Sequence, residues 1–591
     1  MTRSHMRPDR AKVSTPAPMV CLGVWALCAL AAARPAQAVE VQSPRWGFGG
    51  RVVPGRMNLL SVRVRNDTER SWDGTLVLTR GARHGVAHEQ PCYLSPRAER
   101  NVQFLVYVWE TDRSWSLRWG GMSGQQMKVP APKPGPPAVV FLEEPGRLVG
   151  PTQIRAFPPG LLPGSVAAFD GLHALVLDRA PRRLSRAQQQ ALLDWVRGGG
   201  LVHLVQGPDE EYPAFRGLLD ALNSPQQVTD IGAGQVVRHP IDRKEATEEE
   251  LARRGYASPV LETHEEAPIH DLKDMFFGRL QAMEAVVEHK WGSMMALSVL
   301  YVLVVGPINW WLGARRRLDW RLVGLFFLVA VAGFGVAFEW TGRRGYGERT
   351  LVRSLAYARS VGPGRWDLTQ WSSVFVVEGD RYEVTHAADQ NFYEVFDPMD
   401  RVPGYVRGGP KGAAAVDIPI FSSRAVLHRA CLEGPTVDAS RARWTQGRVS
   451  VPVSEELARA FARGYLYRDE QFYELSVQGE RVISDAYPRR NVVNSPAIKA
   501  DDWSYGYYRG PRTLAETSDE YRVGLPALMV RALGGAEELH YQLKPRPTRP
   551  RLFLFARLPD AFDPESASLE EARGYVLYDV PLPRPQAGGD Q

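Results

Sequence analysis

Cysteine is scarce in this chain: there are four among 591 residues, and two of them, Cys21 and Cys28, lie within the first 38 residues. No CxxC pair occurs, which excludes a thioredoxin-like motif and the common cysteine zinc sites. The other two, Cys92 and Cys431, are far apart in sequence. We predict two isolated buried thiols, and a disulfide between them is the alternative in an oxidising compartment.

Catalytic signatures are also missing. The sequence contains no P-loop, no G-x-S-x-G turn, no H-E-x-x-H pair and no G-x-G-x-x-G after a strand. His264 and His270 lie near three glutamates, but their spacing matches no standard metal site and is typical of a solvated acidic loop. We therefore assign no catalytic residue, no cofactor and no metal ligand from the sequence.

The net positive charge of the chain is concentrated in two short segments. Of the formal net charge of +6, residues 1–38 carry +4 and residues 314–321 carry +3, which leaves the rest of the chain at −1. The basic excess is therefore not spread over a surface that could follow phosphates. We predict no nucleic-acid partner.

Two long apolar runs are the most informative feature that is present. Residues 294–313 and the core of residues 322–340 lack ionisable side chains, and each run is close to the ~20 residues that cross a bilayer. The loop between them, residues 314–321, contains four arginines and one aspartate. Because short arginine-rich loops stay cytoplasmic, the pattern predicts a two-helix transmembrane hairpin with both flanking regions outside the cytoplasm. This topology depends on Arg315, Arg316, Arg317 and Arg321.

The N-terminus agrees with this topology. Basic residues precede an apolar stretch from Met19 to Ala33, and the small-x-small site Ala36-Gln37-Ala38 follows. This pattern predicts a signal peptide, residues 1–38, cleaved after Ala38, and an uncleaved signal anchor is the alternative. We predict a multi-pass protein of the inner (cytoplasmic) membrane, with both large regions on the extracytoplasmic side.

Residues 39–129 show period-2 alternation interrupted by turns. The clearest predicted strands are residues 59–64, 74–79, 102–108 and 115–119. Short strands separated by Gly, Pro and Asn predict an antiparallel β-sandwich, which we interpret as immunoglobulin-like, with a jelly roll as the alternative. The proline-rich residues 130–137 predict a stiff, extended linker.

Residues 138–270 have a different pattern. Continuous apolar runs at residues 138–142, 172–177 and 201–205 predict buried strands, and a helix is predicted over Arg186–Arg197. Ser185 can cap this helix, and three glycines end it. Strand, helix and strand with short connections predict a βαβ unit and a parallel sheet. We interpret His203, inside the third strand, as a hydrogen-bonded structural histidine.

Within this segment, residues 169–178 (FDGLHALVLD) and 188–201 (QQQALLDWVRGGGL) resemble the class I glutamine amidotransferase-like domain. The version they resemble occurs in exported bacterial membrane proteins, where a β-sandwich precedes it and a hairpin with a Gly-Pro-x-Asn segment follows. Here that segment is Gly306-Pro307-Ile308-Asn309. Such proteins are often encoded near AAA-type ATPases and von Willebrand A-domain proteins, so the resemblance implies partners of that kind among other envelope proteins.

The chain departs from the catalytic members of that family. A working amidotransferase needs an activated cysteine on a tight strand-to-helix turn. This chain has no cysteine between Cys92 and Cys431, and Gln206-Gly207-Pro208-Asp209 follows the third strand. The resemblance therefore implies a degenerate domain without glutaminase activity.

The remaining segments are predicted from periodicity and composition. Residues 271–293 predict an amphipathic juxtamembrane helix, which either follows the membrane or packs on the α/β domain. Residues 345–580 predict an exported, mainly-β region with strands at residues 374–377, 552–555 and 575–580 and a helix at residues 455–463. Residues 581–591 predict a disordered tail. A candidate binding surface for sugar rings or a protein consists of Trp503, Tyr505, Tyr507 and Tyr508.

Together these features predict a non-enzymatic cell-envelope protein that acts as a scaffold or interaction subunit. In this hypothesis the α/β domain is an interaction platform, and Gln189 and Arg197 on its helix contact a partner. Two alternatives stay open: an enzyme that acts on cell-wall material by unrecognised chemistry, and a signal-transducing or assembly subunit of the membrane.

Overall fold

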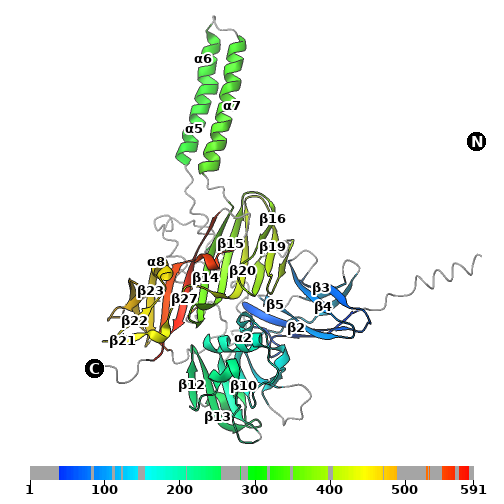
Figure 1. Ribbon diagram of the computed structural model, residues 1–591. Helices are drawn as coiled ribbons and strands as arrows, with labels where there is room; N and C mark the ends of the chain where they lie inside the picture. The colour runs from blue at the N-terminus through cyan, green and yellow to red at the C-terminus, as the bar shows by residue number, and fades with distance from the viewer. Residues whose placement is uncertain are drawn as a thin grey trace, which may run out of the picture.

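The structure is a computed structural model of a mainly-β protein with several sheets, a few helices and two apolar helices that project from one side (Figure 1). The residues it describes are 39–81, 86–108, 114–120, 124–143, 153–207, 209–253, 280, 291–315, 320–345, 350–396, 403–469, 471–488, 528–529, 532, 549–565 and 571–584.

Two sheets pack face to face in the N-terminal part. The first is antiparallel, in the order β1 (Val39–Trp46), β2 (Arg56–Asn66) and β5 (Glu99–Val108). The second contains β3 (Trp72–Arg80), β4 (Ala87–Leu94), β6 (Trp115–Trp119) and β7 (Gln125–Val129). Apolar side chains that alternate along the strands fill the space between them, for example Leu60, Val106, Leu76 and Leu117. The four strands predicted here are confirmed, and the immunoglobulin-like assignment stays a prediction.

The second of these sheets continues into residues that follow the hairpin in sequence. Its other strands are β16 (Asp380–Val384), β19 (Ala413–Ile418) and β18 (Gly404–Arg407). β18 pairs in parallel with β4, so that Tyr405 lies opposite Ala87 and Arg407 opposite Glu89. Arg407 Nη2 also lies 3.1 Å from Glu89 Oε2. One sheet is therefore built from both halves of the chain.

The proline-rich segment after β7 is extended and fixed to the first sheets by backbone bonds. Val52 N donates to Lys133 O at 2.9 Å, and Gly135 N donates to Val52 O at 2.9 Å. These bonds hold the connection to the next unit at a defined place.

The α/β unit has a six-stranded sheet in the order β12-β13-β11-β10-β8-β9. Its parallel strands are β8 (Ala138–Leu142), β9 (Arg155–Phe157), β10 (Leu172–Leu177), β11 (Leu201–Gln206) and β13 (Gly234–Asp242), and β12 (Val228–Ile231) is an antiparallel edge. The helical segments are η1 (Pro159–Leu161), η2 (Val166–Phe169), α2 (Arg186–Arg197), η3 (Gly217–Leu222) and α3 (Glu248–Arg253). The predicted strand, helix and strand are confirmed. Ser185 and Gln188 form a capping box at the start of α2.

The C-terminal part contains an eleven-stranded sheet in the order β17-β20-β15-β14-β27-β26-β23-β24-β25-β22-β21. Its long strands are β14 (Leu351–Gly362), β15 (Arg365–Val376), β20 (Ser422–Glu433) and β27 (Glu571–Pro581). The others are β17 (Asn391–Phe396), β21 (Arg443–Thr445), β22 (Arg448–Pro452), β23 (Phe461–Arg468), β24 (Gln471–Gln478), β25 (Arg481–Ser484) and β26 (Arg551–Arg557). β14 and β27 pair in parallel, and the other neighbours are antiparallel. Two short turns, η6 (Ala439–Arg441) and η9 (Asp560–Phe562), connect strands.

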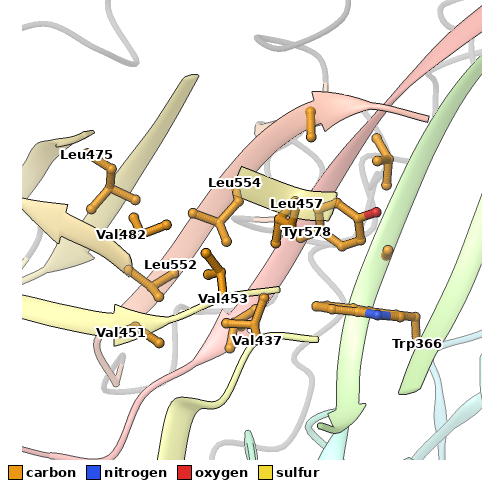
Figure 2. Packing of buried hydrophobic residues seen from close by; sticks show 14 of the residues in the cluster. Trp366, Val437, Val451, Val453, Leu457, Leu475, Val482, Leu552, Leu554 and Tyr578 are labelled. Carbon is orange, nitrogen blue, oxygen red and sulfur yellow. The ribbon is translucent and has the colours of Figure 1, made fainter. Parts of the chain in front are cut away.

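The helix predicted at residues 455–463 is too long. The observed α8 (Glu455–Ala460) ends three residues earlier, because Phe461 already begins β23 and pairs with Ala556 of β26. The strand pairing outweighs the local helical pattern. Leu457 of α8 packs into the apolar core of this part of the sheet, together with Trp366 and Tyr578 (Figure 2). The Trp366 and Tyr578 ring centroids are 4.6 Å apart, and Trp366 Nε1 donates to Pro435 O.

The apolar hairpin consists of α5 (Trp291–Leu303), a π-helical turn η5 (Val304–Ile308), α6 (Asn309–Ala314) and α7 (Trp320–Gly345). Residues Gly292–Ala314 and Trp320–Trp340 are long and apolar enough to cross a membrane, and none of either window is buried in the protein. Gly306 and Pro307 lie in the π-helical turn, which accommodates a proline that lacks an N–H. Tyr301 packs edge-on against Phe334 across the hairpin, with ring centroids 5.3 Å apart.

The residues before and after the hairpin share one apolar core. Met57 and Leu105 of the N-terminal sheets and Ala168 of the α/β unit pack in the same cluster as Leu355 and Trp371 of the C-terminal sheet. Leu280, within the predicted juxtamembrane helix, is fully buried in this cluster as well. At Leu280 the chain thus packs on the body, and the helix over residues 271–293 stays a prediction.

Candidate functional site

The carboxyl edge of the parallel sheet is the first candidate site. Glu143 follows β8 directly, Asp178 follows β10 and Arg243 follows β13. Because parallel strands end at the same edge, these three residues come from distant parts of the sequence to one place. The strand order reverses between β8 and β10, since β9 lies on the other side of β8. Ligands of open α/β sheets bind at such a reversal point.

At this reversal point, Arg243 forms an ion triad with Glu143 and Asp178. Arg243 Nη2 lies 2.5 Å from Glu143 Oε2, and Arg243 Nη1 lies 3.4 Å from Asp178 Oδ2. The guanidinium also stacks over the Phe141 ring, 4.2 Å from its centroid. Both carboxylates are thus bound by one cation across the ends of β8 and β10. Acid–base chemistry there would require Arg243 to move away first.

The turn after β11 is closed by its own backbone hydrogen bonds. Gly207 N donates to Glu211 O at 2.9 Å, and Glu210 N donates to Gly207 O at 3.0 Å. A side chain at position 207 would lie 3.1 Å from Asp178 O, which accounts for the glycine. Pro208 lies outside the described residues, and Asp209 is exposed.

Two buried histidines lie on the face of the sheet opposite α2. His203 Nδ1 and His239 Nε2, from β11 and β13, are 2.8 Å apart. His203 is 2% exposed, so it is a structural histidine as predicted. Among the described residues there is no group of three or more His, Cys, Asp or Glu side chains that could hold a metal.

The junction of the α/β unit with the C-terminal sheet is the second candidate site. Arg429 of β20 donates to Asp170, after η2, at 2.6 Å and to Asp367 of β15 at 2.8 Å. Arg359 of β14 donates to the other oxygen of Asp367 at 2.6 Å. Burial alone would raise the pKa of Asp367, but Arg429 and Arg359 outweigh it and hold that pKa below its usual range. Burial also lowers the pKa of Arg56, from β2, against the opposing effect of Asp170.

This junction includes the C-terminal end of α2, the helix that the sequence predicts as an interaction surface. The second half of α2 is buried, and Asp194 Oδ2 lies 3.0 Å from Arg365 Nη2 of β15. Burial raises the pKa of Asp194, and Arg365 opposes part of that effect. Gly198, at the end of α2, lies against the Arg359 guanidinium. The C-terminal sheet therefore contacts the end of α2 through Asp194 and Gly198, whereas Gln189 and Arg197 are partly exposed and their contact with a partner stays a prediction.

The remaining predicted site residues lie apart from both candidate sites. The Arg315 guanidinium stacks on the Trp311 ring, 3.6 Å from its centroid, and Arg321 lies over Trp320. Cys92 and Cys431 are free thiols, and Cys431 accepts a hydrogen bond from Arg365 Nε at 3.3 Å. Burial raises the pKa of Cys431 to about 11. Several predicted residues lie outside the described ones: Ala36, Ala38, His264, His270, Arg316, Arg317, Trp503, Tyr505, Tyr507 and Tyr508.

The residues of the junction could not be recognised as a site from the sequence. Asp170 reads as part of an Asp-Gly turn and Arg429 as one charge in a strand, so neither carries a local signal. The sequence offers one indirect signal: Asp367 and Arg429 are charged residues within stretches whose other residues are apolar or alternate between apolar and polar.

Comparison with known proteins adds little to this geometry. No family model and no curated protein matches the chain. Among solved structures, it is similar to a cycloisomaltooligosaccharide glucanotransferase of Paenibacillus sp., complexed with cycloisomaltoheptaose. The identity is 11%, and the match covers 66% of this chain and 70% of that chain. Its TM-score of 0.15 is too low to carry an argument about fold or function.

Proposed function

We propose that this chain is a non-enzymatic membrane protein of the cell envelope, in which the apolar hairpin anchors a single extramembrane body that serves as a scaffold or interaction subunit. The observation that carries the proposal is the union of the two halves. Strand β18 completes the sheet of β4, and Arg429 binds Asp170 across the junction. A chain that enters and leaves the membrane within residues 292–340 must therefore keep both halves on the same side.

The four arginines between the helices support an orientation with the loop in the cytoplasm and the body outside it. Trp311 and Trp320 flank the loop and are exposed, as interfacial anchors are. In this orientation the hairpin is an insertion into an exported protein and not a link between two compartments.

The body holds the α/β unit away from the membrane. Strands β14, β15 and β20 each have 12 residues, which corresponds to ~40 Å. One end of this sheet follows α7 directly, and the other end carries Arg359 and Arg365, which contact α2. The carboxyl edge of the α/β unit would then face outward at the far end of the body.

The amidotransferase resemblance fits a role without glutaminase chemistry. The reversal point of the sheet is occupied by Arg243 and its two carboxylates, and one face of α2 serves the chain's own C-terminal half. Partners of the AAA-type ATPase or von Willebrand A-domain kind would find Gln189 and Arg197 partly exposed beside the occupied end of α2.

The first test is of topology. Reporter proteins fused within Gly313–Asp319 are expected to score as cytoplasmic, and truncation fusions near Val205 and Ala515 as exported. The physical reason is that the arginine-rich loop resists translocation and the two helices cross in opposite directions. A cytoplasmic score at either outer position would contradict the shared side of the two halves.

The second test separates a scaffold from an enzyme. In the triple variant Glu143→Gln, Asp178→Asn, Arg243→Met, we expect the retention of envelope partners to be unchanged. All three charges are replaced together by neutral side chains, so no charge is left without its partner. The single change Arg243→Met leaves two carboxylates facing each other. It is expected to lower the free energy of unfolding, but by less than the ~3–5 kcal/mol of a fully buried pair, since Glu143 is 20% exposed.

Partner retention is measured by affinity capture of the full-length chain from detergent extracts, and stability by urea denaturation. Asp209→Asn, at an exposed position of the same edge, is the control. Loss of cellular function in the triple variant, at normal abundance and normal stability, would favour the enzyme alternative instead.

A further inference from the structure

An exposed apolar tip connects β19 and β20. It consists of Ile420 and Phe421, whose side chains are 61% and 57% exposed. The turn is well fixed: Ser422 Oγ donates to Pro419 O at 2.7 Å, and a side chain at Gly379 would lie 2.9 Å from Ile420 N. Two large apolar side chains are thus held in solvent by a rigid turn.

The strand register puts this tip at the end of the sheet that adjoins the hairpin. Leu351, the first residue of β14, pairs with Phe375 of β15, and Val376 pairs with Ser422 of β20. The tip is therefore two strands, or ~10 Å, to the side of Leu351. Five residues, 346–350, lie between the end of α7 at Gly345 and Leu351, so the sheet end lies within ~20 Å of that helix. Figure 1 shows the ends of β15, β16 and β19 on the side from which the hairpin rises.

The backbone at the tip is unfavourable for the residue it carries. Phe421 has φ 51°, a left-handed conformation that glycine and asparagine adopt more readily than an aromatic residue. The other described non-glycine residues with positive φ are Ser43, Arg97, Glu210, Gln446 and Asp469, which are all polar or charged, so Phe421 is the one large apolar side chain among them. An aromatic side chain kept in strained backbone, and without burial in the protein, points to a contact outside it.

We propose that Ile420 and Phe421 insert into the interface of the lipid leaflet that the hairpin crosses, as a second attachment of the body to the membrane. The inference rests on the membrane anchoring proposed above. Two side chains offer far less than the ~800 Å² per partner of a stable protein interface, but they suffice for a chain already tethered to the bilayer. Phenylalanine is among the side chains with which interfacial helices enter the boundary between headgroups and acyl chains. The second attachment fixes the direction in which the α/β unit projects.

The test uses the full-length chain in vesicles of phosphatidylcholine and phosphatidylglycerol. A single cysteine replaces Phe421 in a chain whose other cysteines are changed to serine or alanine, and it is labelled with an environment-sensitive fluorophore. Ile420→Cys is the second reporter of the tip. Trp340→Cys, in α7 on the same side, is the positive control, and Val228→Cys, on the edge strand β12 of the α/β unit, is the membrane-distal control.

Spin-labelled lipids with the quencher near the headgroup are expected to quench the probes at positions 421 and 420 to an extent comparable with the probe at 340, and to leave the probe at 228 unquenched. Quenching at 340 without quenching at 421 and 420 would overturn the lipid contact and leave the anchoring intact. Absence of quenching at 340 would overturn the anchoring itself. A third outcome is that the probe at 421 is blue-shifted and unquenched, with a signal that grows with the protein-to-lipid ratio. That result would show that the tip contacts a second copy of the chain, and it would also overturn the proposal.

The variant Ile420→Ser, Phe421→Asn provides an independent check. Asparagine suits the positive φ, so the body is expected to unfold at an unchanged or higher urea concentration. A probe on Ser423→Cys, next to the tip, is expected to be quenched by the lipids in the parent chain. In this variant the same probe is expected to lose that quenching. Quenching that persists at 423 would show that the two apolar side chains do not make the contact.

Discussion

Replacing Arg429 with methionine is expected to lower the free energy of unfolding by about 3–5 kcal/mol. The change removes a guanidinium that is 3% exposed and that holds Asp367 and Asp170 together. Asp367 is 1% exposed, so its carboxylate would stay in the core with Arg359 as its remaining partner. A loss of this size is a large share of the ~5–15 kcal/mol typical of folded proteins.

The effect reaches beyond one ion pair because Arg429 joins two halves of the chain. Asp170 precedes the hairpin in sequence, and Arg429 and Asp367 follow it. Without the guanidinium, the α/β unit and the C-terminal sheet would each present a carboxylate to the other at their junction. We therefore expect the junction to open before the sheets unfold, and limited proteolysis of the variant to release the α/β unit.

Urea denaturation of the full chain in detergent, followed by tryptophan fluorescence, measures the loss. Arg381→Met is the matched control, since Arg381 binds Asp417 at a similar distance of 2.7 Å but on the surface. This control is expected to leave the midpoint unchanged, because exposed ion pairs contribute little. If Arg429→Met cost no more than the ~1 kcal/mol of a surface pair, the junction would have to be solvated.

The sequence predicted the elements whose signal is local. Alternation identified β2, β3, β5 and β6, and a capping residue, an apolar face and three glycines identified α2 to the residue. The two membrane-length apolar spans, Gly292–Ala314 and Trp320–Trp340, begin and end within two residues of the predicted segments, although helix α7 continues to Gly345. In each case the residues that specify the element are neighbours in the chain, so a window of 10–20 residues contains the information.

The arrangement of these elements could not be predicted in the same way. β18 has four residues, and its pairing partner β4 precedes it by more than 300 residues, so no local pattern links Arg407 to Glu89. The covered face of α2 has the same origin. Asp194 looks like a solvent-facing charge in the helix. Its closest cationic partner is Arg365, on a strand beyond the hairpin, which adds to the local contacts of Gln190 and Arg197.

The candidate sites show the same division. The sequence predicted which positions follow the strands of the α/β unit, and Asp178 is one of them. That Arg243 bridges Asp178 and Glu143 depends on the strand order, which reverses between β8 and β10. The junction of Asp170, Arg429 and Asp367 depends on packing between halves, for which the sequence gives no local signal.

Acid is expected to destabilise the body through three buried histidines that stay neutral in the folded chain. His88, His386 and His428 are each at most 6% exposed. Burial lowers the pKa of His386 to about 3, and burial with the nearby Arg80 lowers the pKa of His88 to about 3. Burial also lowers the pKa of His428 well below 6.5, and His386 and Arg429 add to this. All three rings are neutral in the folded chain at neutral pH.

The direction follows from proton uptake. Below the ordinary histidine pKa of about 6.5, the unfolded chain binds protons that the folded chain does not, so stability falls as the pH drops from 6.5 toward 3. At 1.36 kcal/mol per pH unit, His88 and His386 each account for a loss of about 2 kcal/mol by pH 5. Asp367 does not contribute in this range: its pKa is lowered in the folded chain, so its contribution is lost only at pH below about 4.

The geometry explains why the folded chain resists protonation. The rings of His386 and His428 are stacked, with centroids 3.7 Å apart and planes 11° from parallel, so two imidazolium ions would lie face to face. His386 Nδ1 is 2.9 Å from the Tyr393 hydroxyl, and His428 Nε2 is 2.8 Å from Asn391 Oδ1. His88 lies 3.5 Å from Glu394, which at a histidine pKa of about 3 is a contact of a neutral ring.

Urea denaturation of the full chain at pH 7.5 and at pH 5 tests the prediction, with His386→Gln as the variant. Glutamine does not titrate, so the variant is expected to lose about 2 kcal/mol less than the parent chain between the two pH values, whatever its stability at pH 7.5. Leu457→Ala is the control: it removes buried packing, costs ~2–5 kcal/mol at both pH values and leaves the difference between them unchanged. Equal stability of the parent chain at pH 7.5 and pH 5 would mean that the stacked imidazoles accept protons in the folded state, which requires water or an anion beside His386 and His428.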